Sequence, residues 1–227
     1  MAADGARARC GQSERIPVDP FAALAAFGVQ VLRMPSGVEG VYVREKRASF
    51  ALVNSHTALV RQRFTAAHEI GHHVIHRPDS PPRFIDVVIG GEGQTDPIED
   101  EADAFAAAFL MPEDAVRRLA EAWGSGLDAI NAAVATFVVS KEAAARRMVD
   151  LDLATKADAA VAMKDKPPMA VRVADLNRRR PGGDLVAPDP KAEMNVQVLD
   201  PTLNEMVARI EALGLLDNPR SLARLTP

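Results

Sequence analysis

Apolar residues follow two different periods along this chain of 227 residues. Near the start, short runs rich in valine and leucine are separated by turn-forming segments, a pattern typical of β-strands. The three runs are residues 29–34, 40–44 and 49–54. They predict a small three-stranded antiparallel sheet. A short helix is expected before it, because Asp19 can cap an N-terminus, Pro20 follows, and Gly28 lies near the expected end.

From about residue 57 to residue 76, apolar residues recur at intervals of three and four, the period of an amphipathic helix. Residues 77–97 contain four prolines and three glycines, which predicts mainly a long loop. Further helical patterns cover residues 98–110, 112–123, 127–137 and a segment capped by Ser140. The predicted fold class is therefore α+β and mainly helical, with the small sheet next to the long helix.

The same patterns suggest three parts of the chain. Residues 1–16 are small and polar without periodicity, so a disordered N-terminus is expected. Residues 17–155 form the predicted folded domain. Its last part, residues 126–151, reads as helix, Val-Val-Ser turn and helix. Residues 156–227 are predicted to be a linker or arm rich in proline and arginine, ending in a helix at about 201–214 whose role the sequence leaves open.

Composition and net charge mainly exclude some classes of protein and of metal site. The net charge of −4 does not favour a chain built to hold nucleic acid, which is usually basic. One cysteine, Cys10, excludes an internal disulfide and any zinc site with two thiolates, and it favours a reducing compartment. The first residues lack the apolar stretch of a secretory signal, and no run approaches the ~18 apolar residues that cross a bilayer. We therefore expect a cytoplasmic protein.

Histidines supply the candidate chemistry. Of the five in the chain, four lie within nine residues, at positions 68, 72, 73 and 76. Residues four apart share a helix face, so the imidazoles of His68 and His72 can bind one ion, and zinc accepts two nitrogens while leaving room for a carboxylate and a water. Glu69 lies one residue further round the helix and can face that water. This is the H-E-x-x-H arrangement of zinc hydrolases.

The third ligand is expected from another element. His76 lies eight residues after His68, or ~12 Å along the axis at ~1.5 Å per residue, which one ion cannot span. Glu99 and Asp103, on the next predicted helix, are four apart and share a face. One carboxylate can bind zinc while the other accepts the N–H of a ligand histidine. Glu101 is an alternative ligand, and these acidic residues would also complement a helix N-terminus with no metal present.

Two segments together carry a resemblance to a known family. RQRFTAAHEIGHHVIH, followed about thirty residues later by EDEADAFAAAFLMP, is similar to the ImmA/IrrE family of metallopeptidases. The resemblance covers about residues 19–150, and the paired motifs are far more specific than H-E-x-x-H alone. The family often has Leu-Leu before Met-Pro, where this chain has Phe109-Leu110. Carried over, the zinc ligands are His68, His72 and Glu99, the general base is Glu69, and Asp103 and His76 take the places of the family's Asn/Asp and trailing histidine.

The resemblance also implies a fold and a substrate class. The fold would be zincin-like, of the gluzincin type. Members cut helix-turn-helix repressors in stress responses and in the induction of mobile elements, so a protein substrate of that class is implied. The expected cofactor is Zn²⁺, although two histidines and one glutamate also accept other divalent metals such as Mn²⁺. The oligomeric state is left open.

The expected reaction is peptide hydrolysis by a metal-activated water, with Glu69 as the proton carrier. A donor to the developing oxyanion is still required. The residue types that can serve are present at four positions among which the sequence does not choose: Tyr42, His56, Arg63 and His73. His73 and His76 are otherwise expected to be structural, to support a ligand or to face the substrate.

Three other hypotheses compete with that of a zinc peptidase. The first is a DNA-binding regulator, because residues 126–151 resemble a helix-turn-helix, Arg146 and Arg147 can meet phosphate, and residues 178–180 are three arginines. The acidic total argues against direct binding of nucleic acid. The second is a protein-binding module with a structural or silent zinc site, which would have no need for Glu69. The third is a peptidase that stays inactive until a partner or a change in metal supply activates it.

Overall fold

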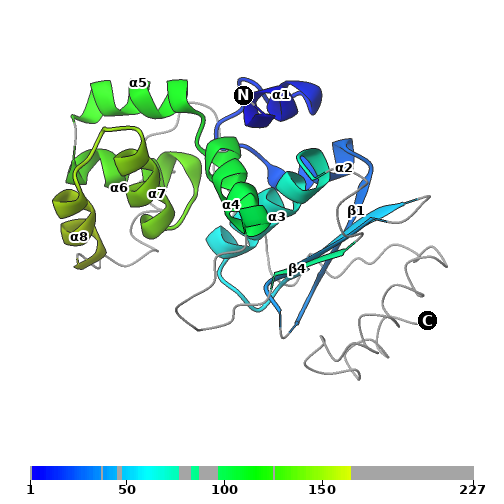
Figure 1. Cartoon of the computed structure of the whole chain (residues 1–227). Helices are drawn as coiled ribbons and strands as arrows, with labels where there is room; N and C mark the ends of the chain where they lie inside the picture. Colours follow the sequence, from blue (N-terminus) through cyan, green and yellow to red (C-terminus); the bar gives the residue numbers. More distant parts are fainter. Residues whose placement is uncertain are drawn as a thin grey trace.

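The computed structural model describes residues 2–36, 38–44, 48–76, 83–86, 97–124 and 126–164, with 83–86 described as backbone. Eight helices and four strands lie in these ranges (Figure 1). The helices are α1 (Ala2–Arg9), α2 (Pro20–Ala26), α3 (Leu59–Val74), α4 (Pro97–Leu110), α5 (Glu113–Trp123), α6 (Leu127–Phe137), α7 (Lys141–Asp150) and α8 (Lys156–Lys164). The strands are β1 (Val29–Met34), β2 (Gly40–Arg44), β3 (Ser49–Asn54) and β4 (Arg83–Asp86).

The mainly helical α+β class is confirmed, but the predicted sheet is wrong in two respects. The sheet has four strands in the order β1-β3-β2-β4, and β1 runs parallel to β3. Only the pairs β2–β3 and β2–β4 are antiparallel. The reason is burial: β3 is buried at every residue after Ser49, so it takes a position between two strands, whereas β1 exposes Gln30 at the edge.

β4 lies within residues 77–97, the stretch predicted to be mainly loop, and its four residues pair with β2. The rest of that stretch before Pro97 lies outside the described residues, as do the predicted arm beyond residue 164 and the helix at 201–214.

The predicted disorder of residues 1–16 is wrong where α1 lies. Ala3 and Ala6 form a small buried face that packs against α4. The side chain of Gln12 then both accepts from the backbone N–H of Asp19 and donates to its carbonyl, each at 2.7 Å. Alanine contributes little to hydrophobic periodicity, so the sequence pattern did not register this face.

α3 lies against one face of the sheet, and α4 packs across α3 (Figure 1). Gly71 allows this close approach, because a Cβ there would stand 3.2 Å from the Cα of Ala102 on α4. Side chains alternate along β2, so Tyr42 joins the core beneath α3 while Val41 and Val43 join a second apolar cluster. The crossing of α3 and α4 brings residues from both helices to one point beside the sheet.

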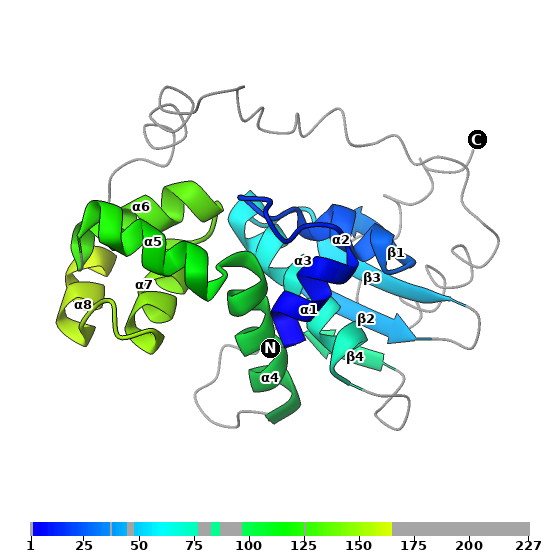
Figure 2. The same ribbon diagram turned by 90° about the horizontal axis from the view of Figure 1, so that it is seen from above.

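Helices α5 to α8 pack on one another and lie on the opposite side of α4 from the sheet, as Figures 1 and 2 both show. The predicted pair of helices in residues 126–151 is confirmed as α6 and α7. Val138 adopts the left-handed conformation between them, and the Ser140 hydroxyl accepts the N–H of Ala143 at the start of α7. Within the described ranges, no helix is long and apolar enough to span a membrane.

Candidate metal centre

The four-residue spacing of His68 and His72 places both imidazoles on one face of α3, as the sequence predicts. Their Nε2 atoms lie 2.9 Å apart, and the rings meet edge to face with centroids separated by 4.6 Å. Both side chains are almost completely buried, with residues 3% and 1% exposed. The two nitrogens therefore converge on one point, toward the neighbouring helix α4.

α4 supplies the third group. Oε2 of Glu99 lies 2.9 Å from Nε2 of His68 and 3.5 Å from Nε2 of His72. One ligand atom from each of these three residues lies within 4.8 Å of the others. Two imidazole nitrogens and one carboxylate oxygen are a donor set that suits zinc and leaves a fourth position open. The chain's own residues thus fit a catalytic zinc ion.

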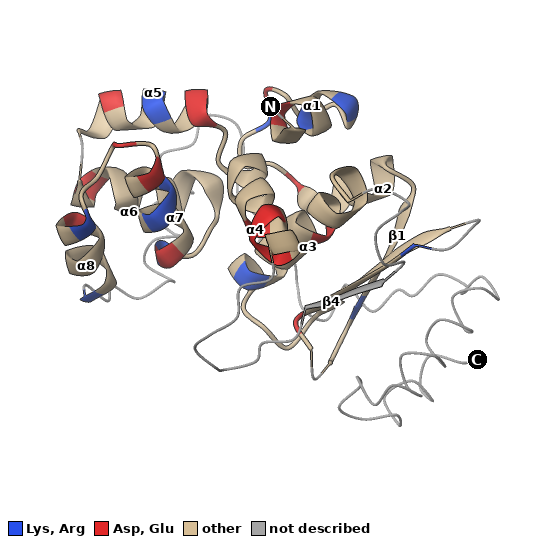
Figure 3. Ribbon diagram, viewed as in Figure 1, with Lys and Arg blue, Asp and Glu red and all other residues tan. Residues whose placement is uncertain are grey.

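The electrostatics of the cluster favour the protonation states that a metal needs. Burial alone would raise the pKa of Glu99, but hydrogen bonds from His68 and His72 outweigh it and lower that pKa to about 2. Burial also lowers the pKa of His72, against the opposing effect of Glu99. At neutral pH Glu99 is therefore ionised and His72 neutral, and both can donate electron pairs. The first turn of α4 contains Glu99 and Asp100, and the ribbon of α4 carries red segments in Figure 3.

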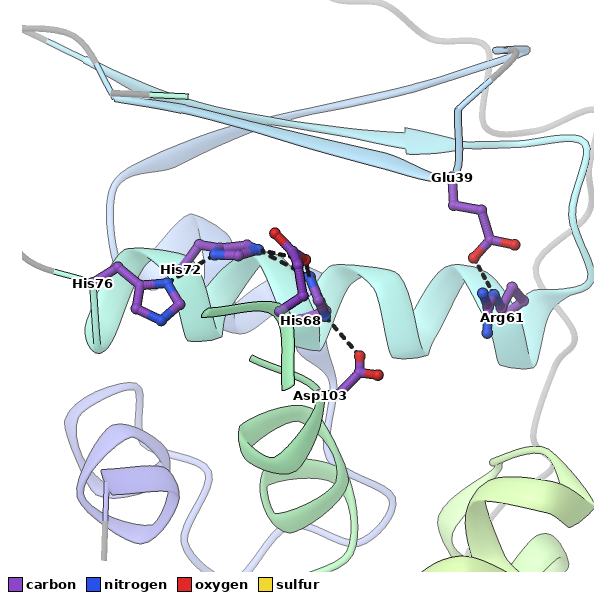
Figure 4. Close-up of polar contacts among 7 residues, drawn as sticks. Glu39, Arg61, His68, His72, His76 and Asp103 are labelled. Atoms are coloured by element: carbon purple, nitrogen blue, oxygen red, sulfur yellow. Dashed lines mark hydrogen bonds and ion pairs between the residues drawn. The ribbon is translucent and has the colours of Figure 1, made fainter. Parts of the chain in front are cut away.

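Each histidine of the pair has a partner on its other nitrogen (Figure 4). Nδ1 of His68 lies 2.9 Å from Oδ1 of Asp103, the relation that the sequence predicts. Nδ1 of His72 lies 2.8 Å from Nδ1 of His76, which places His76 on the side of His72 away from the cluster. Glu101 lies beside His76, with Oε2 at 3.5 Å from its Nε2, and is not one of the three clustered residues. The arrangement favours Glu99 over Glu101 as the third ligand.

Glu69 is 1% exposed and lies against the start of β2. A Cβ built on Gly40 would stand 2.1 Å from Oε1 of Glu69 and 2.5 Å from Cγ2 of Thr65. The carboxylate therefore occupies the space that a side chain at position 40 would fill. Glu69 therefore packs against the backbone of β2, on the same helix as His68 and His72.

The profile of the IrrE N-terminal-like domain, peptidase M78, matches residues 24–149, more than half of the chain. The chain belongs to this metalloprotease family. It is also 37% identical over 98 residues to the radiation response metalloprotease IrrE of Deinococcus radiodurans. That similarity covers 43% of this chain and 29% of the Deinococcus protein, so this chain corresponds to under a third of the relative's length.

Of the four candidate oxyanion donors in this peptidase M78 domain, Tyr42 and His73 lie next to the cluster. The Tyr42 ring stacks beside the His72 ring with centroids 6.5 Å apart, and its hydroxyl lies 2.6 Å from Nδ1 of His73. Arg44 donates to the same hydroxyl at 3.3 Å. Burial, followed by the charges of Arg44 and Arg9, lowers the pKa of His73. The tautomer of the neutral His73 decides whether its Nδ1 accepts from the Tyr42 hydroxyl or donates to it.

The other two candidates lie elsewhere. Arg63 donates to the carbonyls of Val18 at 2.7 Å, Val138 at 3.1 Å and Phe137 at 3.3 Å, so it joins α3 to the chain before α2 and to the turn after α6. Burial lowers its pKa to about 10, which leaves it charged at pH 7. His56 is exposed and lies before α3, which itself begins nine residues before His68, or ~13.5 Å along the helix axis at ~1.5 Å per residue. Neither residue supports the predicted role of oxyanion donor.

Sequence reasoning missed Arg44. It ends β2, and an arginine in that place resembles an ordinary solvated residue of a strand end. In the structure it is half-buried and donates to three carbonyls at the end of α3. No motif marks it, because its partners are backbone atoms about thirty residues further along the chain.

Proposed function

We propose that this protein is a zinc-dependent endopeptidase. The observation that carries the proposal is the convergence of His68, His72 and Glu99 within 4.8 Å, with Glu69 on the same helix as the histidines, in a chain of the peptidase M78 family. A structural zinc site needs neither an open position nor a buried carboxylate beside it. The arrangement therefore supports hydrolysis over a silent zinc site.

In this proposal the three clustered residues hold zinc, which when bound lowers the pKa of water to about 7 and polarises the scissile carbonyl. Glu69 accepts a proton from the attacking water and passes it to the leaving amine. Asp103 holds the ring of His68 through Nδ1, and His76 does the same for His72. These bonds leave the two Nε2 atoms directed at the same point.

Tyr42 is the favoured oxyanion donor, because its ring lies beside His72. Its hydroxyl is hydrogen-bonded to Nδ1 of His73, which holds the orientation of the hydroxyl. Tyr42→Phe tests this role: zinc binding stays near the wild-type level, and kcat falls by roughly 100-fold, the usual effect of removing one such donor. An unchanged kcat removes Tyr42 from the mechanism.

For the substrate, we propose a helix-turn-helix repressor, cleaved in a stress or mobile-element response in the cytoplasm. The support is similarity: the Deinococcus relative is named for a radiation response, and the paired motifs resemble the family that cuts such repressors. Co-expression of the chain with candidate repressors from the same genome, followed by mass spectrometry of the fragments, tests this class. Intact repressors beside cleavage of other proteins would reject the class and leave the peptidase proposal standing.

The DNA-binding alternative receives less support. Arg147 donates to the carbonyl of Met111 at 3.2 Å, and Arg146 pairs with Glu142 on the same helix at 3.5 Å. These two arginines are engaged within the protein, and the net charge of −4 opposes attraction to phosphate. Salt-dependent retardation of DNA by the purified chain would reverse this preference.

Metal removal tests the proposed function directly. We expect a chelator to abolish cleavage of an unfolded protein substrate, and one equivalent of Zn²⁺ to restore it, with Mn²⁺ as a comparison. Glu99→Ala is expected to lose both zinc and activity, whereas the matched variant Glu101→Ala keeps both. Chelator-resistant cleavage, or equal zinc content in the two variants, contradicts the proposed site.

A further inference from the structure

Arg44 joins the sheet to the last turn of the helix that carries the histidines. Its guanidinium donates to the carbonyl of His76 at 2.9 Å, to that of His73 at 3.0 Å and to that of His72 at 3.3 Å. The side chain also lies over the ring of Tyr42, 5.6 Å from its centroid. One half-buried arginine of β2 therefore contacts the backbone of three residues at the end of α3.

Two of these carbonyls, those of His72 and His73, belong to the last turn of α3 and need a partner, whereas His76 follows the helix, which ends at Val74. The last four C=O groups of an α-helix have no intrahelical donor, and the helix C-terminus carries a partial negative charge. A guanidinium has five N–H donors in a rigid planar fork, so it can serve several carbonyls at once, which a lysine ammonium on a flexible stem does less well. Arg44 thus holds the geometry of this turn, and its positive charge also offsets the partial negative charge of the helix C-terminus.

The segment held in this way runs from His72, in the last turn of α3, to its partner His76, just after the helix. Their Nδ1 atoms lie 2.8 Å apart, and Arg44 donates to the backbone carbonyl of each residue. The orientation of the His72 ring depends on where these two backbones stand, because its other nitrogen must face Glu99 at 3.5 Å. A small rotation of the turn would move Nε2 of His72 away from the other two clustered atoms.

We propose that Arg44 is a positioning residue of the metal centre, which sets the direction of the His72 imidazole by holding the carbonyls of the last turn of α3. The inference rests on the proposed function, in which His72 is a metal ligand. It assigns a role to a residue outside both motifs and predicts that metal affinity depends on a side chain of the sheet.

Arg33 on β1 provides a matched control. Like Arg44, it is a half-buried arginine of the sheet, its cation lies over an aromatic ring, 4.7 Å from the centroid of Phe21, and it contacts α3. Its partner is Gln62, to whose Oε1 its Nε donates at 3.2 Å, and Gln62 in turn donates to the carbonyls of Ser55 and Thr57. Arg33 therefore supports the opposite end of the same helix, away from the histidines.

The test compares the full chain with Arg44→Met, Arg44→Lys and Arg33→Met. Zinc affinity is measured by competition with a chromogenic chelator, the visible spectrum of the Co²⁺-loaded protein reports ligand geometry, and thermal unfolding of the metal-free protein reports stability. We expect Arg44→Met to bind zinc about 10–100-fold more weakly, as removal of groups that orient metal ligands typically does. Arg44→Lys shows a smaller loss and an altered Co²⁺ spectrum. Arg33→Met lowers the unfolding temperature while its zinc affinity stays within about twofold of wild type.

The proposal is overturned if both Arg44 variants bind zinc like the wild type, or if Arg33→Met weakens zinc binding as much as Arg44→Met. Where Arg44→Met does not fold, Arg44→Lys decides, since it keeps the charge and most of the packing. The two failures are separable: a wild-type chain that binds no zinc refutes the proposed function, whereas normal zinc affinity in the variants of a zinc-binding chain refutes only the role of Arg44.

Discussion

Gly40→Ala is expected to disturb the proposed general base, Glu69, while leaving the proposed metal ligands in place. The substitution adds one methyl group at the start of β2, where the Cβ would lie 2.1 Å from Oε1 of Glu69 and 2.5 Å from Cγ2 of Thr65. Gly40 has no positive φ, so alanine fits its backbone conformation and the effect comes from the contact alone. Both displaced groups belong to α3, on the side of that helix that faces the sheet.

The size of the expected loss in catalytic rate follows from the distance between the added Cβ and Oε1 of Glu69. Cβ atoms essentially never come closer than 3.0 Å to another heavy atom, so the carboxylate of Glu69 has to retreat by about 1 Å. A misplacement of ~1 Å in a catalytic geometry costs about 100-fold in rate, or about 2.7 kcal/mol of barrier at ~1.36 kcal/mol per tenfold. Overpacking of a buried contact also destabilises the fold by about 1–3 kcal/mol. The three heavy atoms nearest to that Cβ belong to Glu69 and Thr65, and none of them belongs to His68, His72 or Glu99.

The assay measures three quantities on one preparation: zinc stoichiometry, unfolding temperature and kcat/KM on an unfolded protein substrate. We expect Gly40→Ala to hold one zinc, to unfold at a lower temperature and to lose about 100-fold in kcat/KM. Gly5→Ala on α1 is the control, since a Cβ there meets nothing within 4 Å. It should match the wild type in zinc content and kcat/KM, and its unfolding temperature should not fall, because alanine favours a helix more than glycine does. Wild-type activity in a folded, zinc-loaded Gly40→Ala protein would refute the assignment of Glu69 as base.

Three further predictions concern the support of the site. Gly71→Ala places a Cβ 3.2 Å from the Cα of Ala102, which separates α3 from α4 and should weaken zinc binding by about tenfold or more, measured by chelator competition. Asp103→Ala removes the acceptor at Nδ1 of His68 and should weaken zinc binding by about 10–100-fold with little change in unfolding temperature, because Asp103 is half exposed. Arg63→Met leaves three carbonyls without their donor and should reduce the free energy of unfolding by about 3 kcal/mol, measured with denaturant, while zinc affinity stays unchanged.

Local features of the fold were readable from sequence. Asp19 and Ser140 cap helices where expected, because N-capping depends on residues only two or three positions away. The convergence of His68 and His72 follows from helix geometry in the same way. Placing Glu99 beside them required a second motif, since no local rule states which two helices cross.

Features that depend on contacts between residues far apart in the sequence could not be predicted from the sequence. The parallel pairing of β1 with β3 depends on which strand is buried on both sides, and α1 depends on two alanines that pack on α4. Arg44 and Arg63 both bind backbone carbonyls, which have no sequence signature. Arg63 in particular precedes the histidine motif by only five residues, which suggested a place in the site, yet its side chain lies toward α6.

In the proposed mechanism, Glu69 acts as a base beside a zinc ion held by His68, His72 and Glu99. The most direct measurement is the cleavage rate of zinc-loaded Glu69→Gln beside zinc-loaded wild type, with metal content determined on the same samples. We expect one zinc in each protein and a loss of at least roughly 100-fold in rate for the variant, because a general base has been removed. Cleavage by Glu69→Gln at the wild-type rate, with zinc bound, would contradict the proposed mechanism.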